Sequence, residues 1–240
     1  DVTNMHYRSC LKNVYTSDDG ESHLWSTPDG FVFYENGDKC YLIAYRGTST
    51  DIILPTDCNG KNYELYYYSM SDVNFVDGYL YIPSSVTKIY SRAFYYNDTL
   101  LVVEGGESVT QIDGEAFAYC TELLSFTFGA GLTGINKIGT TAFKECTRLY
   151  DVINHSSVAL TKGEFVAYYA IEVVSDATVT ESNIHFTDDG FIFYLYGDMC
   201  YLIGYVGDGD DAIKGQLTLP THFGGMGYSV YSKAIREKNG

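Results

Sequence analysis

Six cysteines have the widest choice of chemistry in this sequence, because a thiolate can bind a metal, attack a carbonyl or form a disulfide. They are Cys10, Cys40, Cys58, Cys120, Cys146 and Cys200. No pair has the Cys-x-x-Cys or Cys-x-x-His spacing of a zinc site, so we expect no metal site. An even number of cysteines is also typical of secreted proteins with disulfides, but the repeats described below argue against three of them.

The other residues that could carry chemistry form no recognised constellation. The five histidines are never spaced as a ligand pair on one element; they are His6, His23, His155, His185 and His222. The acidic stretch 207–215 lacks the Gly and Glu that an EF-hand needs in register, so we expect a solvated loop. Neither a Gly-x-Ser-x-Gly elbow nor a phosphate-binding glycine loop occurs. The sequence therefore predicts a protein that is not an enzyme, with no catalytic residue and no cofactor.

The charge of the chain limits its partners. With 31 acidic and 15 basic residues, the formal net charge is −16. Such a charge repels nucleic-acid phosphates and anionic lipids, so we expect no nucleic-acid partner. No apolar run is long enough to span a membrane, and we expect no membrane insertion in this segment. Cationic and neutral partners remain open, and the oligomeric state is unknown.

A repeat decides where these residues lie. One column of the repeat, with intervals of 23, 26 and 22 residues, is Phe94, Phe117, Phe143 and Phe165. Six residues after each of these comes Leu100, Leu123, Leu149 and Ile171. Between the two columns lies a third, Asn97, Cys120, Cys146 and Tyr168. Repeats of this length form the turns of a solenoid, and each turn is too small to bury its own apolar side alone.

Each turn has the same predicted elements. The Ala-Phe pair indicates a short helical or 3-10 turn, and Leu-x-x-Val indicates a strand with alternate side chains inward. The preceding Val-Thr-x-Ile indicates a second short strand. A small polar residue in the third column is expected to satisfy backbone groups that the turn leaves unpaired. Cysteines at such repeated positions, namely Cys120 and Cys146 or Cys40 and Cys200, are predicted to be buried thiols. The redox states of Cys10 and Cys58 stay open.

The repeat frame carries a resemblance to a known family. The segment "SVTQIDGEAFAYCTELLSFTF" at 108–128 resembles the BspA-like leucine-rich repeat family of bacterial and protist surface proteins, and "YIPSSVTKIYSRAF" at 81–94 matches the start of that repeat. The resemblance covers residues 84–175. It implies a cell-surface or secreted location and adhesion to a host protein or to another cell.

A longer duplication surrounds the short one. "DGFVFYENGDKCYLIAYRG" at 29–47 and "DGFIFYLYGDMCYLIGYVG" at 189–207 share thirteen of nineteen residues. Each predicts two strands of a β-hairpin, with turns centred on Asn36-Gly37 and Tyr196-Gly197. The flanks keep the repeat in degenerate form, with Met70 and Ile235 in place of Phe, and with Met5, Leu11 and Val14 near the start. We therefore expect the chain to be a segment of a longer solenoid.

The predicted fold class is a leucine-rich-repeat solenoid, mostly β with short helical or 3-10 turns and α/β by class, interrupted by two homologous β-hairpin modules. Residues 1–240 are expected to form one continuous solenoid segment. Its predicted parts are a partial repeat at 1–26, a hairpin module at 27–62, leucine-rich repeats at 63–185, a second hairpin module at 186–227 and the start of a further repeat at 228–240.

The predicted binding surface is the outward face of the strands that follow each helical turn. The inward residues of these strands are taken to be Val14, Val103, Phe126, Val152 and Val174. Their outward neighbours give the candidate binding residues Asn13, Tyr15, Glu104, Ser125, Thr127, Asp151, Ile153 and Ser175. This strand strip mixes apolar, hydroxyl and acidic groups, and it lacks the clustered Trp, Tyr and Arg that are typical of binding hot spots.

Three functions fit these observations. The first is a non-catalytic recognition or adhesion segment that binds a protein or glycan ligand on a host or neighbouring cell, because a solenoid offers an extended face without a reactive centre. The second is a structural spacer in a larger surface protein. The third and most remote is a carbohydrate-active enzyme, which would need two carboxylates facing each other across a cleft.

Overall fold

The computed structural model describes residues 23–49, 51–206, 217–232 and 234. The chain divides into two compact units, residues 1–178 and residues 179–240, and each unit is described by itself. Within the described residues, no helix is long and apolar enough to cross a membrane. Several positions singled out above lie outside the described residues: Met5, His6, Cys10, Leu11, Asn13, Val14, Tyr15, the acidic stretch 207–215 and Ile235.

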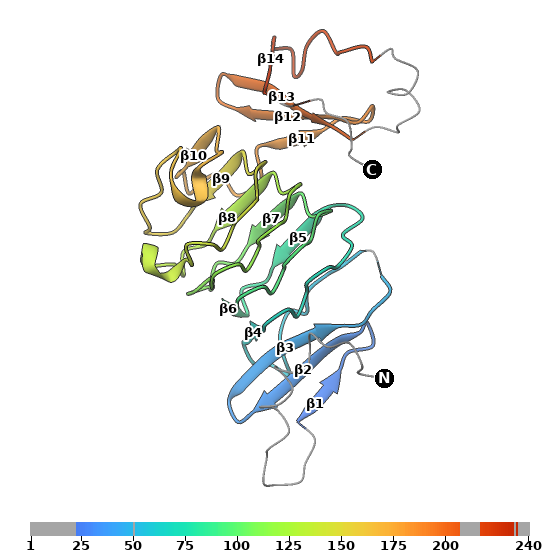
Figure 1. Cartoon of the computed structure of the whole chain (residues 1–240), viewed down its shortest axis with the longest axis vertical. Helices are drawn as coiled ribbons and strands as arrows, with labels where there is room; N and C mark the ends of the chain where they lie inside the picture. The colour runs from blue at the N-terminus through green and yellow to red at the C-terminus, as the bar shows by residue number, and fades with distance from the viewer. Residues whose placement is uncertain (1–22, 50, 207–216, 233, 235–240) are drawn as a thin grey trace. The chain divides into compact units, whose positions relative to one another are not determined.

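The first unit begins with a five-stranded sheet (Figure 1). Its strand order is β1-β2-β3-β4-β6, with bounds Leu24–Ser26, Phe31–Asn36, Lys39–Tyr45, Tyr63–Leu65 and Val86–Ile89. β1, β2 and β3 pair antiparallel as a meander, whereas β4 and β6 join them in parallel. The change from antiparallel to parallel pairing marks the point at which the hairpin ends and the coil of repeats begins.

The second sheet of the first unit is wholly parallel. Its strands lie side by side, one for each turn of the chain, in the order β10-β9-β8-β7-β5 (Figure 1). Their bounds are Tyr79–Ile82 for β5, Val102–Gly105 for β7, Ser125–Phe128 for β8, Asp151–Asn154 for β9 and Glu172–Val174 for β10. Such a parallel stack, with almost no helix, is a β-solenoid, and it confirms the predicted leucine-rich-repeat fold.

The core of this unit follows the predicted columns. In strand register, Leu80 lies beside Val103, Val103 beside Phe126 and Phe126 beside Val152. All four side chains are buried. Because neighbouring parallel strands lie about 4.8 Å apart, equivalent residues on successive turns stack in contact and exclude water.

An aromatic stack fills the opposite side of the core. The ring of Phe117 lies parallel to those of Phe94 and Phe143, at centroid distances of 4.8 and 5.3 Å. Phe126 meets Phe117 edge-on at 5.0 Å. Met70 is fully buried one turn earlier, as its place in the Phe column predicts. Its backbone N–H donates to Ala93, just as that of Phe94 donates to Ala116.

The third column does the hydrogen-bonding work that its residue types suggest. Asn97 is fully buried; its Nδ2 donates to the carbonyl of Met70 at 2.8 Å, and its Oδ1 accepts from the N–H of Val73 at 2.8 Å. The thiols of Cys120 and Cys146 donate to backbone carbonyls of the preceding turn at 3.2 and 3.1 Å. The prediction that this column satisfies turn backbone, with Cys120 and Cys146 as buried thiols, is therefore confirmed.

The fourth turn of the repeat departs from the prediction by one residue. Phe165 is 37% exposed and opens the 3-10 helix η3, Phe165–Ala167, while Val166 and Ala167 are buried. Tyr168 is also exposed. The strand register pairs Val152 with Val173, so Val173 takes the inward place that was predicted for Val174. A second 3-10 helix, η2, spans Ile135–Lys137.

The second unit contains a four-stranded sheet, β11-β12-β13-β14, with bounds Ile184–Phe186, Phe191–Tyr196, Met199–Tyr205 and Ser229–Val230. β2–β3 and β12–β13 both form the predicted hairpins, but each turn lies one residue later than expected. Asn36 pairs with Lys39 and Tyr196 with Met199, so the two-residue loops are 37–38 and 197–198. Glycine holds the first loop position, at φ of 60° and 56°, because it adopts positive φ at little cost.

The two hairpin modules differ at the equivalent cysteines Cys40 and Cys200. In the first, Cys40 forms a disulfide with Cys58, with Cα atoms 6.5 Å apart; the prediction of a buried thiol at Cys40 is wrong. In the second, Cys200 is a free buried thiol, as predicted. The bridge Cys58–Lys61 of the first module corresponds to Phe223–Met226 of the second, and the ring of Phe223 stacks on that of Phe193 at 4.3 Å.

Candidate functional site

The strand strip does not offer the predicted surface. Ser125, Thr127, Asp151 and Ile153 have exposed fractions of 0%, 5%, 0% and 0%. Ser125 faces Asp151 in register across β8 and β9, and its hydroxyl donates to that carboxylate at 2.7 Å. Alternation along a strand shows which side chains share a face of the sheet, but not whether that face is exposed. The assumption that these four residues point to solvent is therefore wrong.

The two ends of the strip differ from its middle. Ser175 is exposed but lies beyond β10, because Val174 and not Ser175 takes the outward place beside Ile153. Glu104 is half-buried and accepts a hydrogen bond from Tyr79 at 2.8 Å. Tyr79 and Tyr81 of β5 are 45% and 54% exposed. The exposed part of this face thus lies over β5 and β7 and is aromatic.

A larger set of tyrosines lies on strands β2 and β3 and on the turns that follow the strands. We call it the tyrosine surface; it comprises Tyr34, Tyr41, Tyr66, Tyr67, Tyr68, Tyr90, Tyr95, Tyr96 and Tyr119. Its rings form two groups, Tyr34, Tyr41, Tyr66, Tyr67 and Tyr90 in one and Tyr68, Tyr95, Tyr96 and Tyr119 in the other. Within each group, the centroids of contacting rings lie between 4.6 and 6.5 Å apart, in edge-on, tilted and stacked pairs. Tyrosine and arginine are enriched in binding hot spots. The clustering that the strand strip lacks is therefore present on the turns.

One half of the tyrosine surface surrounds a carboxylate. Glu64 lies beside Tyr41 and Lys88 in the register of β3, β4 and β6. Burial, together with a hydrogen bond to Glu64, raises the pKa of Tyr90 far above its ordinary value, and burial also raises the pKa of Tyr41. The ammonium of Lys88 lies 4.0 Å from the ring centroid of Tyr90 and forms an ion pair with Asp113 at 3.3 Å. These tyrosines are therefore neutral hydrogen-bond donors at physiological pH.

The other half is built on a repeated backbone conformation. Asp72, Tyr96, Tyr119 and Glu145 occupy equivalent places on four successive turns, and all have left-handed φ values of 57° to 64°. The N–H of each of the first three donates to the residue just before the next one along. Residues other than glycine rarely adopt this conformation. We call these four residues the outer column; it places two tyrosines between two acids.

The rings of the outer column are ordered by their neighbours. Tyr96 and Tyr119 stack at 4.7 Å with an angle of 8° between their planes, and Tyr95 meets both edge-on. Tyr96 is 51% exposed, and Asp72 and Glu145 are exposed as well. Burial raises the pKa of Tyr95, and the neighbouring tyrosines Tyr96 and Tyr119 raise it further. The column is thus a stacked pair of rings, exposed at Tyr96, with an exposed carboxylate at each end.

A second left-handed column lies four residues earlier in each turn and consists of Tyr68, Arg92 and Glu115. Arg92 donates from Nε to Glu115 at 2.6 Å and from a terminal nitrogen to the hydroxyl of Tyr68. Its guanidinium carbon lies 5.6 Å from the ring centroid of Tyr68 and 5.4 Å from that of Tyr95. These hydrogen bonds raise the pKa of Arg92. Arg92 therefore fastens three turns of the tyrosine surface together.

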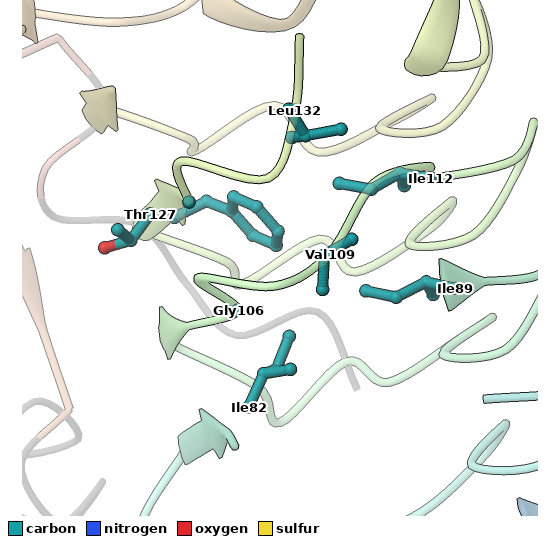
Figure 2. Close-up of a pocket in the computed structure, with 9 residues that line it drawn as sticks. Ile82, Ile89, Gly106, Val109, Ile112, Thr127 and Leu132 are labelled. Atoms are coloured by element: carbon teal, nitrogen blue, oxygen red, sulfur yellow. The ribbon is translucent and has the colours of Figure 1, made fainter. Parts of the chain in front are cut away.

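The cavity inside the first unit is not a ligand site. It is lined by residues of the inward columns, among them Ile82, Ile89, Val109, Ile112 and Leu132 (Figure 2). Its volume is about 200 Å³ with open solvent included, below the range of about 300–1,000 Å³ typical of ligand pockets. Figure 2 shows the hydroxyl of Thr127 directed away from the other side chains. No carboxylate lines this cavity, so it offers no pair of acids for glycoside hydrolysis.

One set of potential metal ligands occurs among the described residues. Glu35, Cys40 and Cys58 have ligand atoms within 4.8 Å of one another. The two sulfurs are joined as a disulfide, however. The Glu35 carboxylate accepts hydrogen bonds from Trp25 at 3.2 Å and Asn59 at 2.6 Å. The arrangement closes the hairpin module and leaves no thiolate to bind a metal.

Sequence reasoning missed the tyrosine surface, although a signal was present. Tyrosines occur in pairs and triplets next to the Phe column, as "YYY" at 66–68 and "YY" at 95–96. A residue at the turn is next to its equivalent on the following turn, so tyrosines in those places must meet. Strand alternation predicts a binding face on the strands, and it carries no information about the turns between them.

Comparisons with known proteins concern the repeats. A family model described as "BspA type Leucine rich repeat region" matches residues 61–191 in six copies. A solved structure, a leucine rich cell surface protein from Faecalibacterium prausnitzii A2-165, is 16% identical with a TM-score of 0.42; the match covers 77% of this chain and 62% of that one. No curated protein matches the sequence. The extent of the six repeats, more than half of the chain, shows that this protein belongs to the BspA-type leucine-rich repeat family.

Proposed function

We propose that the first unit is a non-catalytic recognition segment of a cell-surface or secreted protein, and that it binds a protein or glycan on a host or neighbouring cell through the tyrosine surface. One observation carries the proposal: Tyr68, Tyr95, Tyr96 and Tyr119, from three successive turns, meet on one surface, and Arg92 lies over the rings of Tyr68 and Tyr95. Tyrosine supplies a large contact area at low cost in side-chain entropy, and its hydroxyl gives specificity.

Membership of the repeat family also supports a role in recognition. Proteins of this repeat family, and the cell-surface protein with a similar structure, suggest a surface protein with an interaction role. Of the predicted strand strip, Glu104 and Ser175 remain candidate contact residues, since they lie at its accessible ends. Ser125, Thr127, Asp151 and Ile153 are not part of the proposed surface because they are buried.

A binding screen tests the proposal. The whole chain is presented to arrays of extracellular proteins and of glycans, beside a variant with Tyr96→Ser and Tyr119→Ser. A matched control carries Tyr168→Ser and Tyr169→Ser, which are also exposed and adjacent but lie outside the tyrosine surface. We expect partners that bind the wild type and the control equally and lose affinity for the first variant by at least about tenfold, the loss typical of hot-spot residues. Partners that bind all three alike would refute this surface.

The structural spacer is the alternative, and one observation favours it. The four turns that carry β5, β7, β8 and β9 are joined in series by backbone hydrogen bonds on both the strand and the turn sides, and such bonds hold a stack together without any partner. Single-molecule stretching separates the readings, because a spacer must unfold only at high force. Low-force unfolding of the turns together with a confirmed partner would eliminate the spacer.

A further inference from the structure

We propose that the partner contacts the outer column with a basic polypeptide segment, whose Arg or Lys side chains lie on the free ring face of Tyr96 and are attracted by the carboxylates of Asp72 and Glu145. This inference rests on the proposed function and names the chemistry of its partner. The geometry that carries it is the order of the column, in which an acid, two stacked rings and a second acid follow on successive turns.

The stack leaves one ring face of Tyr96 for a partner. Tyr119 covers the face of Tyr96 that is directed towards the later turns, at 4.7 Å. The other face is directed towards the preceding turn, where Asp72 occupies the equivalent position and is exposed. A guanidinium or ammonium group on that face would meet the negative π cloud of the ring and a carboxylate at the same time.

The protein already places its own cations in this way. The charged groups of Lys88, Arg92 and Lys144 lie over rings of the tyrosine surface at distances between 4.0 and 5.6 Å from the centroids. Lys88 and Arg92 also form ion pairs with Asp113 and Glu115. These cations show that the rings are oriented and spaced to receive positive side chains. Lys88 and Arg92 are paired with carboxylates and repel an incoming cation little. Lys144 already lies over Tyr119, so an incoming cation meets the ring of Tyr96 instead.

Charge decides between the occupants of such a surface. The chain has a formal charge of −16, so a second copy would be repelled and an acidic partner even more so. Exposed carboxylates occur at Asp72 and Glu145 of the outer column and at Asp98, two residues after Tyr96. A basic segment is therefore steered towards the column, and its association should slow as salt screens the field.

The test uses the whole chain and three synthetic peptides of equal length: alternating Arg-Gly, alternating Lys-Gly and an uncharged Ser-Gly peptide. Affinities are measured by calorimetry at low and at physiological salt. We expect the arginine peptide to bind more tightly than the lysine peptide, because guanidinium also stacks on aromatic rings, and the uncharged peptide not to bind. Tyr96→Leu should weaken the arginine complex by roughly two- to fivefold, the effect of an exposed cation–π contact.

A charge-matched pair of variants removes the effect of net charge. Asp72→Asn with Glu145→Gln and Glu164→Gln with Asp176→Asn each remove two exposed acids from the first unit. We expect only the outer-column pair to weaken binding strongly. Equal losses in both would show a general attraction of basic peptides to an acidic protein and would overturn the inference, as would full affinity in Tyr96→Leu.

The proposed function and this inference fail differently. A natural partner that requires Tyr96 and Tyr119, but is a glycan or a neutral protein segment insensitive to salt, would leave the recognition role intact and overturn the basic partner. Natural partners that ignore the tyrosine surface would refute both. A natural partner lost on Asp72→Asn with Glu145→Gln, and recognised through Arg or Lys residues, would support both.

Discussion

Replacement of Phe117 by alanine should be the most damaging single truncation in the first unit. The side chain is fully buried, and its ring contacts Phe94 and Phe143 face to face and Phe126 edge to face. A buried Phe-to-Ala change costs about 3–5 kcal/mol through lost transfer energy and the cavity left behind. Three aromatic pairs, each contributing about 0.5–1.5 kcal/mol, place Phe117 in the upper half of that range.

The assay is urea unfolding followed by far-UV circular dichroism, with amide hydrogen exchange read separately for residues 79–154. Exchange is needed because a repeat array can unfold in parts, and then a single transition does not report the damage. Phe143 is only half-buried, so its truncation should cost less.

Phe165→Ala is the matched control, since this phenylalanine belongs to the same column in the sequence but is 37% exposed in the structure. Its truncation should change stability by about 0.5 kcal/mol or less, as for other surface positions. A cost for Phe117→Ala below about 1 kcal/mol, or equal costs at 117 and 165, would refute the assignment of the stack.

Three further predictions concern the cysteines and one buried tyrosine. The disulfide between Cys40 and Cys58 joins residues 18 apart in the sequence. Its reduction should destabilise the first hairpin module by about 3 kcal/mol, because the unfolded chain regains loop entropy. In urea melts, Cys58→Phe, which copies the second module, should lose less stability than Cys58→Ser. Cys120 and Cys146 should react slowly with a thiol reagent in the folded protein and rapidly in denaturant, because both are buried and burial raises the pKa of Cys120; fast labelling before unfolding would contradict this. Burial raises the pKa of Tyr63 well above its ordinary value, so the contribution of Tyr63 to stability should be constant below about pH 10 and fall above it. Urea melts at pH 8 and pH 11 check this, and Tyr63→Phe should show a smaller fall between these two pH values.

The columns of the core could be predicted from the sequence because they depend only on residue type and on the interval of one turn. An apolar residue that recurs at the interval of one turn has to stack on its equivalent, and a single Asn or Cys in that series implies unpaired backbone nearby. Met70 was placed correctly for the same reason, since any apolar side chain of similar size fills the column. The last turn was misplaced by one residue because Phe165 matches the column in type, whereas burial of Val166 and Ala167 decides the register.

The surface could not be predicted in the same way. Alternation along a strand tells which side chains share a face, but not what covers that face, and the burial of Ser125 and Asp151 depends on the strands beside them. The pairing of Cys40 with Cys58 depends on a Cα distance that spacing alone does not reveal. The tyrosine surface arises from residues on separate turns that meet only after the chain has coiled.

The hydrogen bonds of the Asn and Cys column all run in one direction along the coil. Asn97 reaches back to Met70, Cys120 to Phe94 and Cys146 to Phe117, so each turn carries the side chain that completes the turn before it. A turn added after the last one therefore supplies the side chain that bonds it to the turn before it, and no residue of the earlier turns has to change. Such an array can lengthen by duplication of single units, whereas loss of its last unit exposes the apolar side and the strand edge of the turn before it.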